Sequence, residues 1–471
     1  MVEKIPVKMS KEDSASRNTQ SVIAHALIAL LSAECKVYCI LTGYDQLPDS
    51  FDSDIDFMVD ANDFERMPAL IQDLAKRTNT RLFRATEHEM SARAYLLVAQ
   101  SDSNLTFVSP DCTSDYRHYG LLWLHADEVL ANRRWHPNGF WIPSPSHEFI
   151  YYLIKRMNKR DFTSEQGLRL HRLYTEDPQR ADQMLARYWS GHHKETLRSM
   201  AASGDWDALL PNLASFRDEL MRHSIESPIE KLGSLRRRVH HFMDRVLRPT
   251  GGWIAFMGPD GCGKSSVIEA ITAEFAPAFR EVDRFHMHPK FLRRSTGGKA
   301  LVTDPHGLPP RSLLTSIAKV FYYVADYLLG YWLRIRPAII RTKLVVFDRY
   351  FYDLLVDHKR VRYGGPAWML TLAGKLVPRP ELVILLNAPA EVLWSRKQEV
   401  PFEEVVRQQK NYCELAERLQ STVIIDASQP LPDVILQTAE AIIAHFAQRT
   451  AVRLGLDSQT SSLDLVGASK K

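Results

Sequence analysis

Cysteines and long hydrophobic runs are scarce in this chain of 471 residues. The five cysteines are odd in number and lack paired C-x-x-C spacing, so neither a disulfide framework nor a zinc site is indicated. The most apolar run, residues 320–333, contains Asp326 and is too short to cross a bilayer. The first residues of the chain are polar and of mixed charge, unlike a signal peptide. We therefore expect a cytoplasmic protein with reduced thiols, and we do not expect membrane contact.

The chain also has little net charge. Its 60 Lys and Arg residues and 56 Asp and Glu residues leave a formal charge of +4, which does not indicate a nucleic-acid partner. A hydrophobic fraction of 45% and a charged fraction of 25% are ordinary for a folded globular protein. The length is too great for one hydrophobic core. We expect two or three domains and leave the oligomeric state open, with a dimer as one possibility.

The most informative motif is the segment Gly258 to Ser265, which reads Gly-Pro-Asp-Gly-Cys-Gly-Lys-Ser. It matches the phosphate-binding pattern G-x-x-x-x-G-K-[ST] at every fixed position. An apolar run of strand type at residues 253–257 precedes it, and a helical pattern at residues 266–271 follows it. This is the context that the motif requires, and it disfavours the alternative of a glycine-rich turn without a ligand.

The residue types of this loop suit a nucleoside triphosphate with Mg²⁺. Its backbone N–H groups and the N-terminal end of the next helix attract phosphate. Lys264 can reach the β- and γ-phosphates, and the Ser265 hydroxyl can ligate Mg²⁺. We therefore predict ATP and Mg²⁺ as cofactors. The predicted nucleotide-binding residues of the loop are Gly258, Pro259, Asp260, Gly261, Cys262, Gly263, Lys264, Ser265 and Ser266.

Charged residues follow two further predicted strands. Asp348 and Arg349 come directly after the apolar residues 344–347, and ligands of open α/β sheets bind at this carboxyl edge. Asp348 can hold Mg²⁺, and Arg349 can bind an acceptor phosphate through two hydrogen bonds. Arg396 lies on a predicted helix after the strand at residues 382–386 and can neutralise charge on the transferred phosphoryl group. The alternative for each residue is an ordinary surface charge.

The order of the predicted elements indicates an α/β fold with several parts. Residues 1–143 mix helical and strand patterns and predict an α+β domain, whereas residues 144–235 have a helical pattern. Residues 236–448 alternate strands with helical stretches, which predicts a parallel sheet with helices on both faces. Residues 449–471 end in a stretch rich in Ser, Gly and Asp and are expected to form a disordered tail.

The C-terminal motifs resemble those of the thymidylate kinase family of nucleoside-monophosphate kinases. They are Gly258 to Ser266, Asp348-Arg349-Tyr350, the helix of Arg396 with Tyr412 after it, and Ile425-Asp426-Ala427-Ser428, within residues 253–446. The resemblance implies a five-stranded parallel sheet and Mg-ATP as the phosphoryl donor. It also implies that Arg396 lies in a mobile lid and that Ala427 and Ser428 lie near the adenine ring. The predicted catalytic residues are Lys264, Asp348, Arg349 and Arg396.

The acceptor side departs from that family. Its members usually carry a basic Arg-x-Pro-Gly element after the second strand, whereas residues 284–290 here read Arg-Phe-His-Met-His-Pro-Lys. An aromatic and basic insertion follows. The charged segment 353–363 either contributes to the acceptor pocket or forms a surface helix. We therefore expect a small acceptor of nucleotide or sugar type, and we expect dTMP to be a poor one.

Two carboxylates near the N-terminus suggest a second site. Asp54 and Asp56 alternate along one predicted strand and face the same side, where they repel each other unless a divalent cation lies between them. A turn at Gly43 precedes them, and Asp111 comes just after a strand predicted at residues 105–108. Spacing alone leaves both a metal site and a solvent-facing acidic strand end open.

This arrangement resembles the nucleotidyltransferase superfamily built on the palm of DNA polymerase β, over residues 22–119. The resemblance implies that Asp54, Asp56 and Asp111 hold Mg²⁺. The helical region after it resembles the helical substrate domains that often follow such catalytic cores. Gly43 is followed by Tyr44, where active members usually have Ser or Gly, so the domain is either catalytic or structural.

Three functions remain open from the sequence. ATP-dependent phosphoryl transfer to a small acceptor is the one we favour. A regulatory module that holds ATP and hydrolyses it slowly would differ from it, because its ATP turnover would not rise with one particular acceptor. Nucleotidyl transfer by the N-terminal domain would instead leave a labelled α-phosphate on a product.

Overall fold

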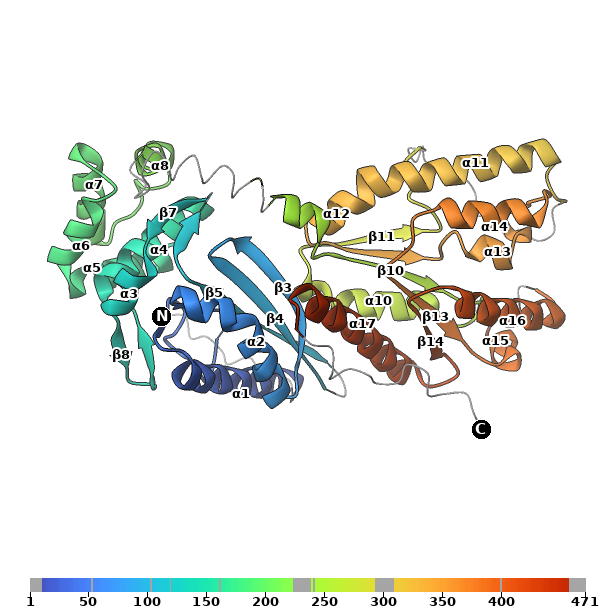
Figure 1. Cartoon of the computed structure of the whole chain (residues 1–471), viewed down its shortest axis with the longest axis horizontal. Coiled ribbons are helices and arrows are strands. Elements are labelled where there is room, and N and C mark those ends of the chain that lie inside the picture. Colours follow the sequence, from blue (N-terminus) through green and yellow to red (C-terminus); the bar gives the residue numbers. More distant parts are fainter. Residues whose placement is uncertain are drawn as a thin grey trace, which may run out of the picture. The chain divides into compact units, whose positions relative to one another are not determined.

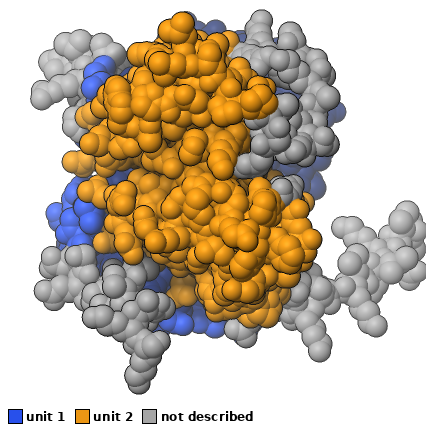
Figure 2. Space-filling model, turned by 90° about the vertical axis from the view of Figure 1, so that its right-hand side faces the viewer, with its two compact units in different colours: residues 1–99, 106–244, 450–456 blue, residues 100–105, 245–449, 457–471 orange. Residues whose placement is uncertain are grey.

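A computed structural model describes most of the chain (Figure 1). The described residues are 11–51, 54–101, 104–118, 120–160, 162–222, 239, 242–292, 309–398 and 400–456, with side chains from residue 16 onward. The chain divides into two compact units (Figure 2). Unit 1 comprises residues 1–99, 106–244 and 450–456, and unit 2 comprises residues 100–105, 245–449 and 457–471. The domain boundary expected at residue 235 lies outside the described residues.

Unit 1 contains a five-stranded sheet in the order β1-β2-β5-β4-β3. The strands are β1 (Tyr38–Ile40), β2 (Asp54–Val59), β3 (Arg81–Glu89), β4 (Ala92–Gln100) and β5 (Leu105–Thr113). β2 pairs with β1 antiparallel and with β5 parallel. Helices α1 (Lys11–Glu34) and α2 (Ala61–Arg77) contribute apolar side chains to one core with this sheet. Asp60 caps α2 by accepting a hydrogen bond from the N–H of Asp63.

The rest of unit 1 consists of short hairpins and helices. Strands β6 (Tyr116–His118) and β7 (Leu121–Leu124), helix α3 (Ala126–Ala131), and strands β8 (Arg134–His136) and β9 (Phe140–Ile142) come first. Helices α4 (Pro145–Lys159), α5 (Ser164–Glu176), α6 (Pro178–Leu185), α7 (Gly191–Ser203) and α8 (Leu213–Arg222) follow. The region predicted to be helical is thus helical over much of its described length.

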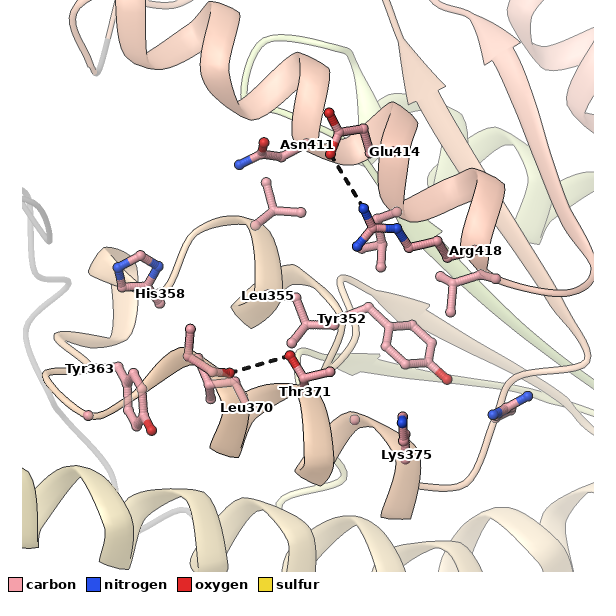
Figure 3. Close-up of a pocket in the computed structure, with 17 residues that line it drawn as sticks. Tyr352, Leu355, His358, Tyr363, Leu370, Thr371, Lys375, Asn411, Glu414 and Arg418 are labelled. Carbon is pink, nitrogen blue, oxygen red and sulfur yellow. Dashed lines mark hydrogen bonds and ion pairs between the residues drawn. The ribbon is translucent and has the colours of Figure 1, made fainter.

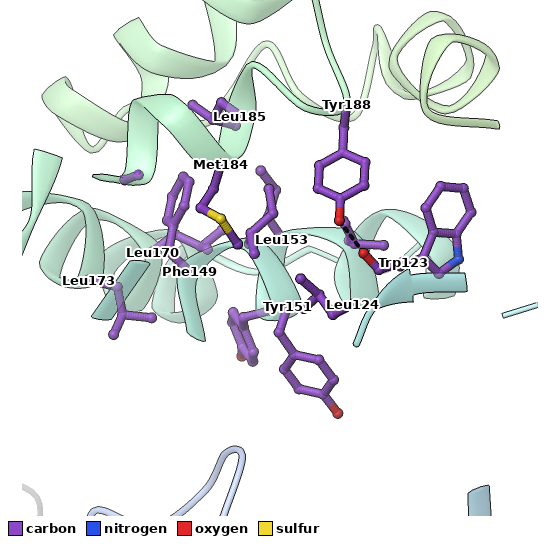
Figure 4. Packing of buried hydrophobic residues seen from close by; sticks show 14 of the residues in the cluster. Trp123, Leu124, Phe149, Tyr151, Leu153, Leu170, Leu173, Met184, Leu185 and Tyr188 are labelled. Atoms are coloured by element: carbon purple, nitrogen blue, oxygen red, sulfur yellow. Dashed lines mark hydrogen bonds between the residues drawn. The ribbon is translucent and has the colours of Figure 1, made fainter. Parts of the chain in front are cut away.

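A second apolar core holds these helices together (Figure 4). Phe149 and Leu153 of α4 pack with Leu170 of α5 and Leu185 of α6, and all four side chains are buried. The stripe on α4 has the spacing that a helix needs to turn one face toward a core. The start of α5 is fixed by a capping box, in which the Thr163 side chain accepts from the helix and Gln166 accepts in return.

Unit 2 contains a five-stranded sheet in the order β11-β12-β10-β13-β14. The strands are β10 (Gly252–Met257), β11 (Val282–His286), β12 (Leu344–Asp348), β13 (Leu382–Asn387) and β14 (Thr422–Asp426), and every neighbouring pair is parallel. β10 is buried along its whole length, which explains its continuous apolar sequence. The predicted parallel sheet is confirmed.

Helices cover both faces of this sheet (Figure 1). One face packs against α11 (Leu313–Gly330), α12 (Arg336–Ile340), α13 (Asp353–Val356), α14 (Ala367–Leu376) and α16 (Phe402–Arg418). Helices α10 (Lys264–Glu274) and α17 (Leu431–Arg453) lie on the opposite side in Figure 1, and α15 (Ala390–Arg396) follows β13. A five-residue π-helix, Tyr331–Ile335, joins α11 to α12. None of the described helices is long and apolar enough to cross a membrane.

Helix α17 continues beyond the point where the tail was expected to begin. The helix ends at Arg453, four residues after the predicted start of the tail at residue 449. Leu454 and Leu456 then pack against the apolar core of unit 1 that contains the sheet. The remaining residues of the expected tail, 457–471, lie outside the described part of the chain.

Candidate active site

The phosphate-binding loop connects β10 to α10, at the middle of the unit 2 sheet. From β10 the chain moves first to β11 and β12 on one side and later to β13 and β14 on the other. The carboxyl end of β10 is therefore the switch point of the sheet, where ligands of open α/β folds bind. The sequence folds in this way because a buried apolar strand meets a helix at a glycine-rich turn.

Three glycines give the loop its shape. Gly258, Gly261 and Gly263 have φ values of +141°, +85° and +83°, which side chains rarely adopt. A Cβ atom on Gly258 would lie 2.3 Å from the carbonyl oxygen of Leu386, and one on Gly261 would lie 2.7 Å from that of Leu393. Gly263, at the start of α10, instead has open space in front of it. The loop can thus receive a phosphate group against its backbone and the helix N-terminus.

Lys264 lies inside this loop. Its side chain is buried, and its Nζ donates hydrogen bonds to the carbonyl oxygens of Gly258 and Pro259, at 2.8 and 2.7 Å. Burial lowers the pKa of Lys264 below its ordinary value, although nearby groups such as Asp260 act in the opposite direction. A bound phosphate would bring negative charge to this ammonium group. The residues present therefore fit a nucleoside triphosphate.

Two arginines bind the carboxylate of Asp260, which belongs to the same loop. Arg349 donates to Oδ1 of Asp260, and Arg360 donates to Oδ2. Burial alone would raise the pKa of Asp260, but the two guanidinium groups hold it at about 2. The loop is therefore tied to two cations that come from the segment after β12.

Arg349 is itself held by groups behind it. It is buried and has a φ of +66°, and its Nη1 lies 3.2 Å from Oδ1 of Asp353 and 3.4 Å from the hydroxyl of Tyr412. Tyr412 donates to Asp353, whose other oxygen accepts from the N–H of Tyr350 at 2.9 Å. Sequence reasoning identified Arg349 but not this set of partners. It left open whether Asp353 and Arg360 belonged to a pocket or to a surface helix.

Asp348 lies at the carboxyl end of β12, beside His286 at the end of β11. The two residues are register partners, and the imidazole Nδ1 lies 3.3 Å from the carboxylate. Burial would raise the pKa of Asp348, but His286 and Lys264 lower it, so the carboxylate is charged. Ser265 is exposed in the first turn of α10. Carboxylate and hydroxyl oxygens are ligands that suit Mg²⁺.

Arg396 and Ala427 come together in the structure. Arg396, the last residue of α15, donates a hydrogen bond of 2.7 Å to the carbonyl oxygen of Ala427. Ser428 donates from its N–H and its hydroxyl to Asp426 at the end of β14. The structure thus joins two of the predicted nucleotide-site residues by a direct contact. The lid role of Arg396 and the adenine contacts of Ala427 and Ser428 stay predictions.

Of the three carboxylates predicted to form a site in unit 1, the structure brings two together on neighbouring strands. Asp56 and Asp111 are register partners on the parallel strands β2 and β5. β5 extends to Thr113, so Asp111 lies within the strand rather than after it. Burial, followed by the charge of Asp56, raises the pKa of Asp111 to about 7. Asp54 is exposed at the start of β2.

A lysine that sequence reasoning missed binds Asp56. Lys155 of α4 places its Nζ 2.7 Å from Oδ2 of Asp56, and the Thr42 hydroxyl donates to the same oxygen at 3.1 Å. Burial would raise the pKa of Asp56, but Lys155 lowers it. Within the described residues, no group of three or more His, Cys, Asp or Glu side chains is arranged to hold a metal ion. The assignment of Asp54, Asp56 and Asp111 as metal ligands stays a prediction.

Tyr44 has a structural role in unit 1. Its ring is buried and its hydroxyl donates to Glu148, which also accepts from Arg169 Nη2 at 2.5 Å and from Nε at 3.2 Å. Burial raises the pKa of Glu148, although Arg169 and Tyr44 oppose this shift. The residue after Gly43, where the resembling superfamily usually has Ser or Gly, is therefore an aromatic side chain packed in the interior of unit 1.

The sequence of unit 2 matches a known family. Residues 256–437 match the sequence model of the thymidylate kinase family. The C-terminal part of the chain is therefore similar in sequence to thymidylate kinases. The probable thymidylate kinase of Thermococcus gammatolerans is 27% identical over 199 residues, which cover 39% of this chain and 92% of that protein. The thymidylate kinase of Leuconostoc citreum is 28% identical over 218 residues, which cover 40% of this chain and 92% of that protein. A crystal structure of thymidylate kinase from Ehrlichia chaffeensis has a TM-score of 0.30 and 15% identity, and covers 41% of this chain and 98% of that one.

The segment after β11 in unit 2 is held against α11 by hydrogen bonds. Asp326 of α11 is fully buried and accepts from His288 Nδ1 at 2.7 Å and from the N–H groups of Lys290 and Leu292. These partners lower the pKa of Asp326, against the effect of its burial. The segment that departs from the family pattern is therefore held by a buried carboxylate of α11.

Proposed function

We propose that this chain transfers the γ-phosphoryl group of ATP to a small acceptor of nucleotide or sugar type. The observation that carries the proposal is the phosphate-binding loop at the switch point, in which Lys264 is buried and Asp260 is bound by Arg349 and Arg360. The thymidylate kinase family match supports a kinase-type phosphotransferase. The acceptor is the part of this proposal that the match does not give.

In the proposed reaction the protein positions charges and needs no covalent intermediate. Lys264 and the loop N–H groups would hold the β- and γ-phosphates, and the oxygens of Ser265 and Asp348 would hold Mg²⁺. The ion would offset the negative charge that builds up on the phosphates. Arg349 and Arg360 are placed to exchange Asp260 for an anionic group of the acceptor, because both already bind a carboxylate. Arg396 is proposed to move from Ala427 toward the transferred group.

The proposed acceptor differs from dTMP, although the relatives are named as thymidylate kinases. His288 is occupied by Asp326 and so does not replace an arginine at an acceptor phosphate. A second group of cations lies nearby in the same unit. Burial, followed by the charges of Arg311 and Arg362, lowers the pKa of Lys319 to about 8. We propose that these residues select an anionic acceptor of a different shape.

An acceptor screen tests the proposal. Purified full-length protein is mixed with ATP and Mg²⁺ and with one compound at a time from a panel of nucleoside monophosphates, sugars and sugar phosphates, and ADP release is recorded. We expect one class of compound to raise ADP release well above the rate with ATP alone. An ADP release that no compound changes would favour the regulatory module instead.

A second function is proposed for unit 1, nucleotidyl transfer, on one observation. Asp56 and Asp111 face each other across neighbouring strands, beside the Thr42-Gly43 turn. Its test is ATP labelled at the α-phosphate, followed by a search for a labelled product other than AMP and ADP. The full chain with Asp56→Asn is the control, and an equal amount of labelled product from this variant would refute the function.

A further inference from the structure

Unit 2 contains a second cavity that no residue of the phosphate-binding loop lines. Its volume is about 490 Å³, within the range of small-molecule sites. It lies among α13, α14 and α16 (Figure 3). Leu355, Leu370, Leu415 and Leu419 give it an apolar lining. A cavity of this size and lining can hold the apolar or aromatic body of an organic molecule.

One polar group in the lining has no partner. Tyr352 is 3% exposed, and its hydroxyl has no hydrogen-bond partner among the described residues. Burial raises the pKa of Tyr352, so the hydroxyl keeps its proton and can donate. A buried hydroxyl without a partner is unfavourable, and a ligand with an acceptor group would remove that cost. The cavity thus offers a hydrogen-bond donor in an apolar wall.

The rim of the cavity carries mainly positive charge. Lys375 comes from the last turn of α14 and Arg418 from the last turn of α16 (Figure 3). Arg379, in the segment after α14, also lines the cavity. The single carboxylate in the lining, Glu414, lies 3.7 Å from Arg418. The structure shows no ion pair for Lys375 or Arg379 with any described residue. A ligand with a negative group would therefore be attracted to this rim.

The cavity is distinct from the candidate active site but shares two helices with it. On α13, Asp353 binds Arg349, while Leu355 lines the cavity. On α16, Tyr412 binds Asp353, while the adjacent Asn411 lines the cavity. The two sites thus lie on different faces of the same helices. An occupant of the cavity would contact the elements that hold Arg349.

We propose that this cavity binds a small organic anion, a molecule with an apolar or aromatic body and one phosphate, sulfonate or carboxylate group. The apolar body lies against the leucines, the anionic group faces Lys375 and Arg379, and Tyr352 donates to an oxygen of the ligand. The inference does not depend on phosphoryl transfer, because it rests on the cavity alone.

The experiment uses 8-anilinonaphthalene-1-sulfonate, an aromatic anion whose fluorescence rises in apolar surroundings. It is titrated into the full-length protein with ATP and Mg²⁺ present, so that the phosphate-binding loop is not available to the probe. One variant, Lys375→Glu with Arg379→Glu, reverses the charge of the rim. A second, Thr371→Trp, fills the cavity from an exposed position of α14. Lys76→Glu, an exposed charge reversal on α2 outside the lining, is the control.

We expect saturable binding by the unaltered protein and by the control, with dissociation constants within twofold of each other. The rim variant should bind at least tenfold more weakly, and Thr371→Trp should lose the saturable phase. Thermal unfolding of each variant shows whether the fold is kept. Since the substituted residues are exposed, each variant should melt near the temperature of the unaltered protein. Dissociation constants that stay within twofold in both cavity variants would overturn the proposal.

Discussion

Arg349, directly after β12, donates a hydrogen bond to Asp260 in the phosphate-binding loop, 89 residues earlier in the chain. Arg349 is buried, and Asp260 also binds Arg360. The contact joins the loop proposed to bind phosphate to the segment proposed to bind the acceptor. It places a carboxylate where an anionic substrate group would otherwise meet two arginines. Both the stability and the activity of unit 2 should therefore depend on Asp260.

The stability that Asp260 provides should be lost at low pH. An unfolded aspartate has a pKa of about 3.9, and the pKa of Asp260 in the folded chain is about 2. Because the folded state binds the proton more weakly, the stabilisation is complete above about pH 4 and is lost as the pH falls toward about 2. Its size is about 2 to 3 kcal/mol. Asp260→Asn should show a smaller loss of stability over this range than the unaltered protein.

The free energy of unfolding is measured by urea denaturation of the full-length protein at a series of pH values. Glu417→Gln, an exposed change on α16, is the control and should leave the pH profile unchanged. An Asp260→Asn protein as stable as the unaltered one at pH 7, with the same loss at low pH, would contradict the ion pair.

Tyr412→Phe should lower activity, because the Tyr412 hydroxyl contacts both Arg349 and the Asp353 carboxylate that holds Arg349 in place. The variant removes the donor to Asp353 and costs about 1 to 3 kcal/mol, because a buried carboxylate loses a hydrogen bond. Tyr350→Phe is a matched control, since the Tyr350 hydroxyl is bonded to the carbonyl oxygen of Pro378 rather than to a charged group. We expect both variants to be less stable, and only Tyr412→Phe to lower kcat. Equal kcat values would show that Tyr412 has a packing role alone.

Activity with dTMP should be weak compared with the best acceptor of the screen. Residues 287–290, directly after β11, read Met-His-Pro-Lys instead of the Arg-x-Pro-Gly element, and His288 is bound to Asp326. One missing charged hydrogen bond to a phosphate costs about 2 kcal/mol, which is roughly thirtyfold in kcat/KM. Steady-state rates with both acceptors test this. A kcat/KM for dTMP equal to that of the best acceptor would show that the pocket has not changed in specificity.

Asp111→Asn should stabilise unit 1 at pH 8 in the absence of divalent cations. The pKa of Asp111 is about 7, so its folded state binds a proton more tightly than the unfolded state does. The stabilisation that the protonated Asp111 side chain provides is therefore present at low pH and is lost as the pH rises from about 4 to about 7. Asparagine removes the buried charge. Thermal unfolding at pH 5 and pH 8 measures the effect, and a variant that melts lower than the unaltered protein at pH 8 would contradict it.

Metal binding by unit 1 can be tested with a substitution of one of its carboxylates. If Asp54, Asp56 and Asp111 hold Mg²⁺, titration of Mg²⁺ or Mn²⁺ with nucleotide should give heat in a Lys264→Ala background, where the other site is weakened. The heat should disappear with Asp56→Asn, because each lost carboxylate lowers the charge that faces the ion. Equal heats in the two proteins would mean that the carboxylates of unit 1 have a structural role.

Local patterns predicted much of the fold. The loop from Gly258 to Ser265 has its strand and helix because both flanks are short segments with clear periodicity. The end of β5 was misplaced, since Pro110 reads as a strand breaker although the strand continues through it, with Ile55 as its register partner. The predicted domain boundary put the start of the tail at residue 449, whereas the stretch rich in Ser, Gly and Asp begins at about Leu454 and α17 continues to Arg453.

The contacts of the candidate site could not be predicted in this way. Arg360 and Asp260 are 100 residues apart, and Lys155 and Asp56 are 99 residues apart. Such pairs depend on how the elements pack, which periodicity does not report. A carboxylate in the loop and a run of charged residues after β12 were visible in the sequence. Which cation would meet which carboxylate was not.

Transfer of the γ-phosphate is the measurement that tests the central claim most directly. ATP labelled at the γ-phosphate is incubated with the best acceptor of the screen and with either the unaltered protein or Lys264→Ala. We predict a labelled acceptor with the unaltered protein and none with Lys264→Ala, while both proteins give the same circular dichroism spectrum. Lys264 bonds to loop carbonyls rather than packing in the apolar core, so the fold should survive its loss. Labelled acceptor formed at an undiminished rate by a folded Lys264→Ala protein would contradict the account.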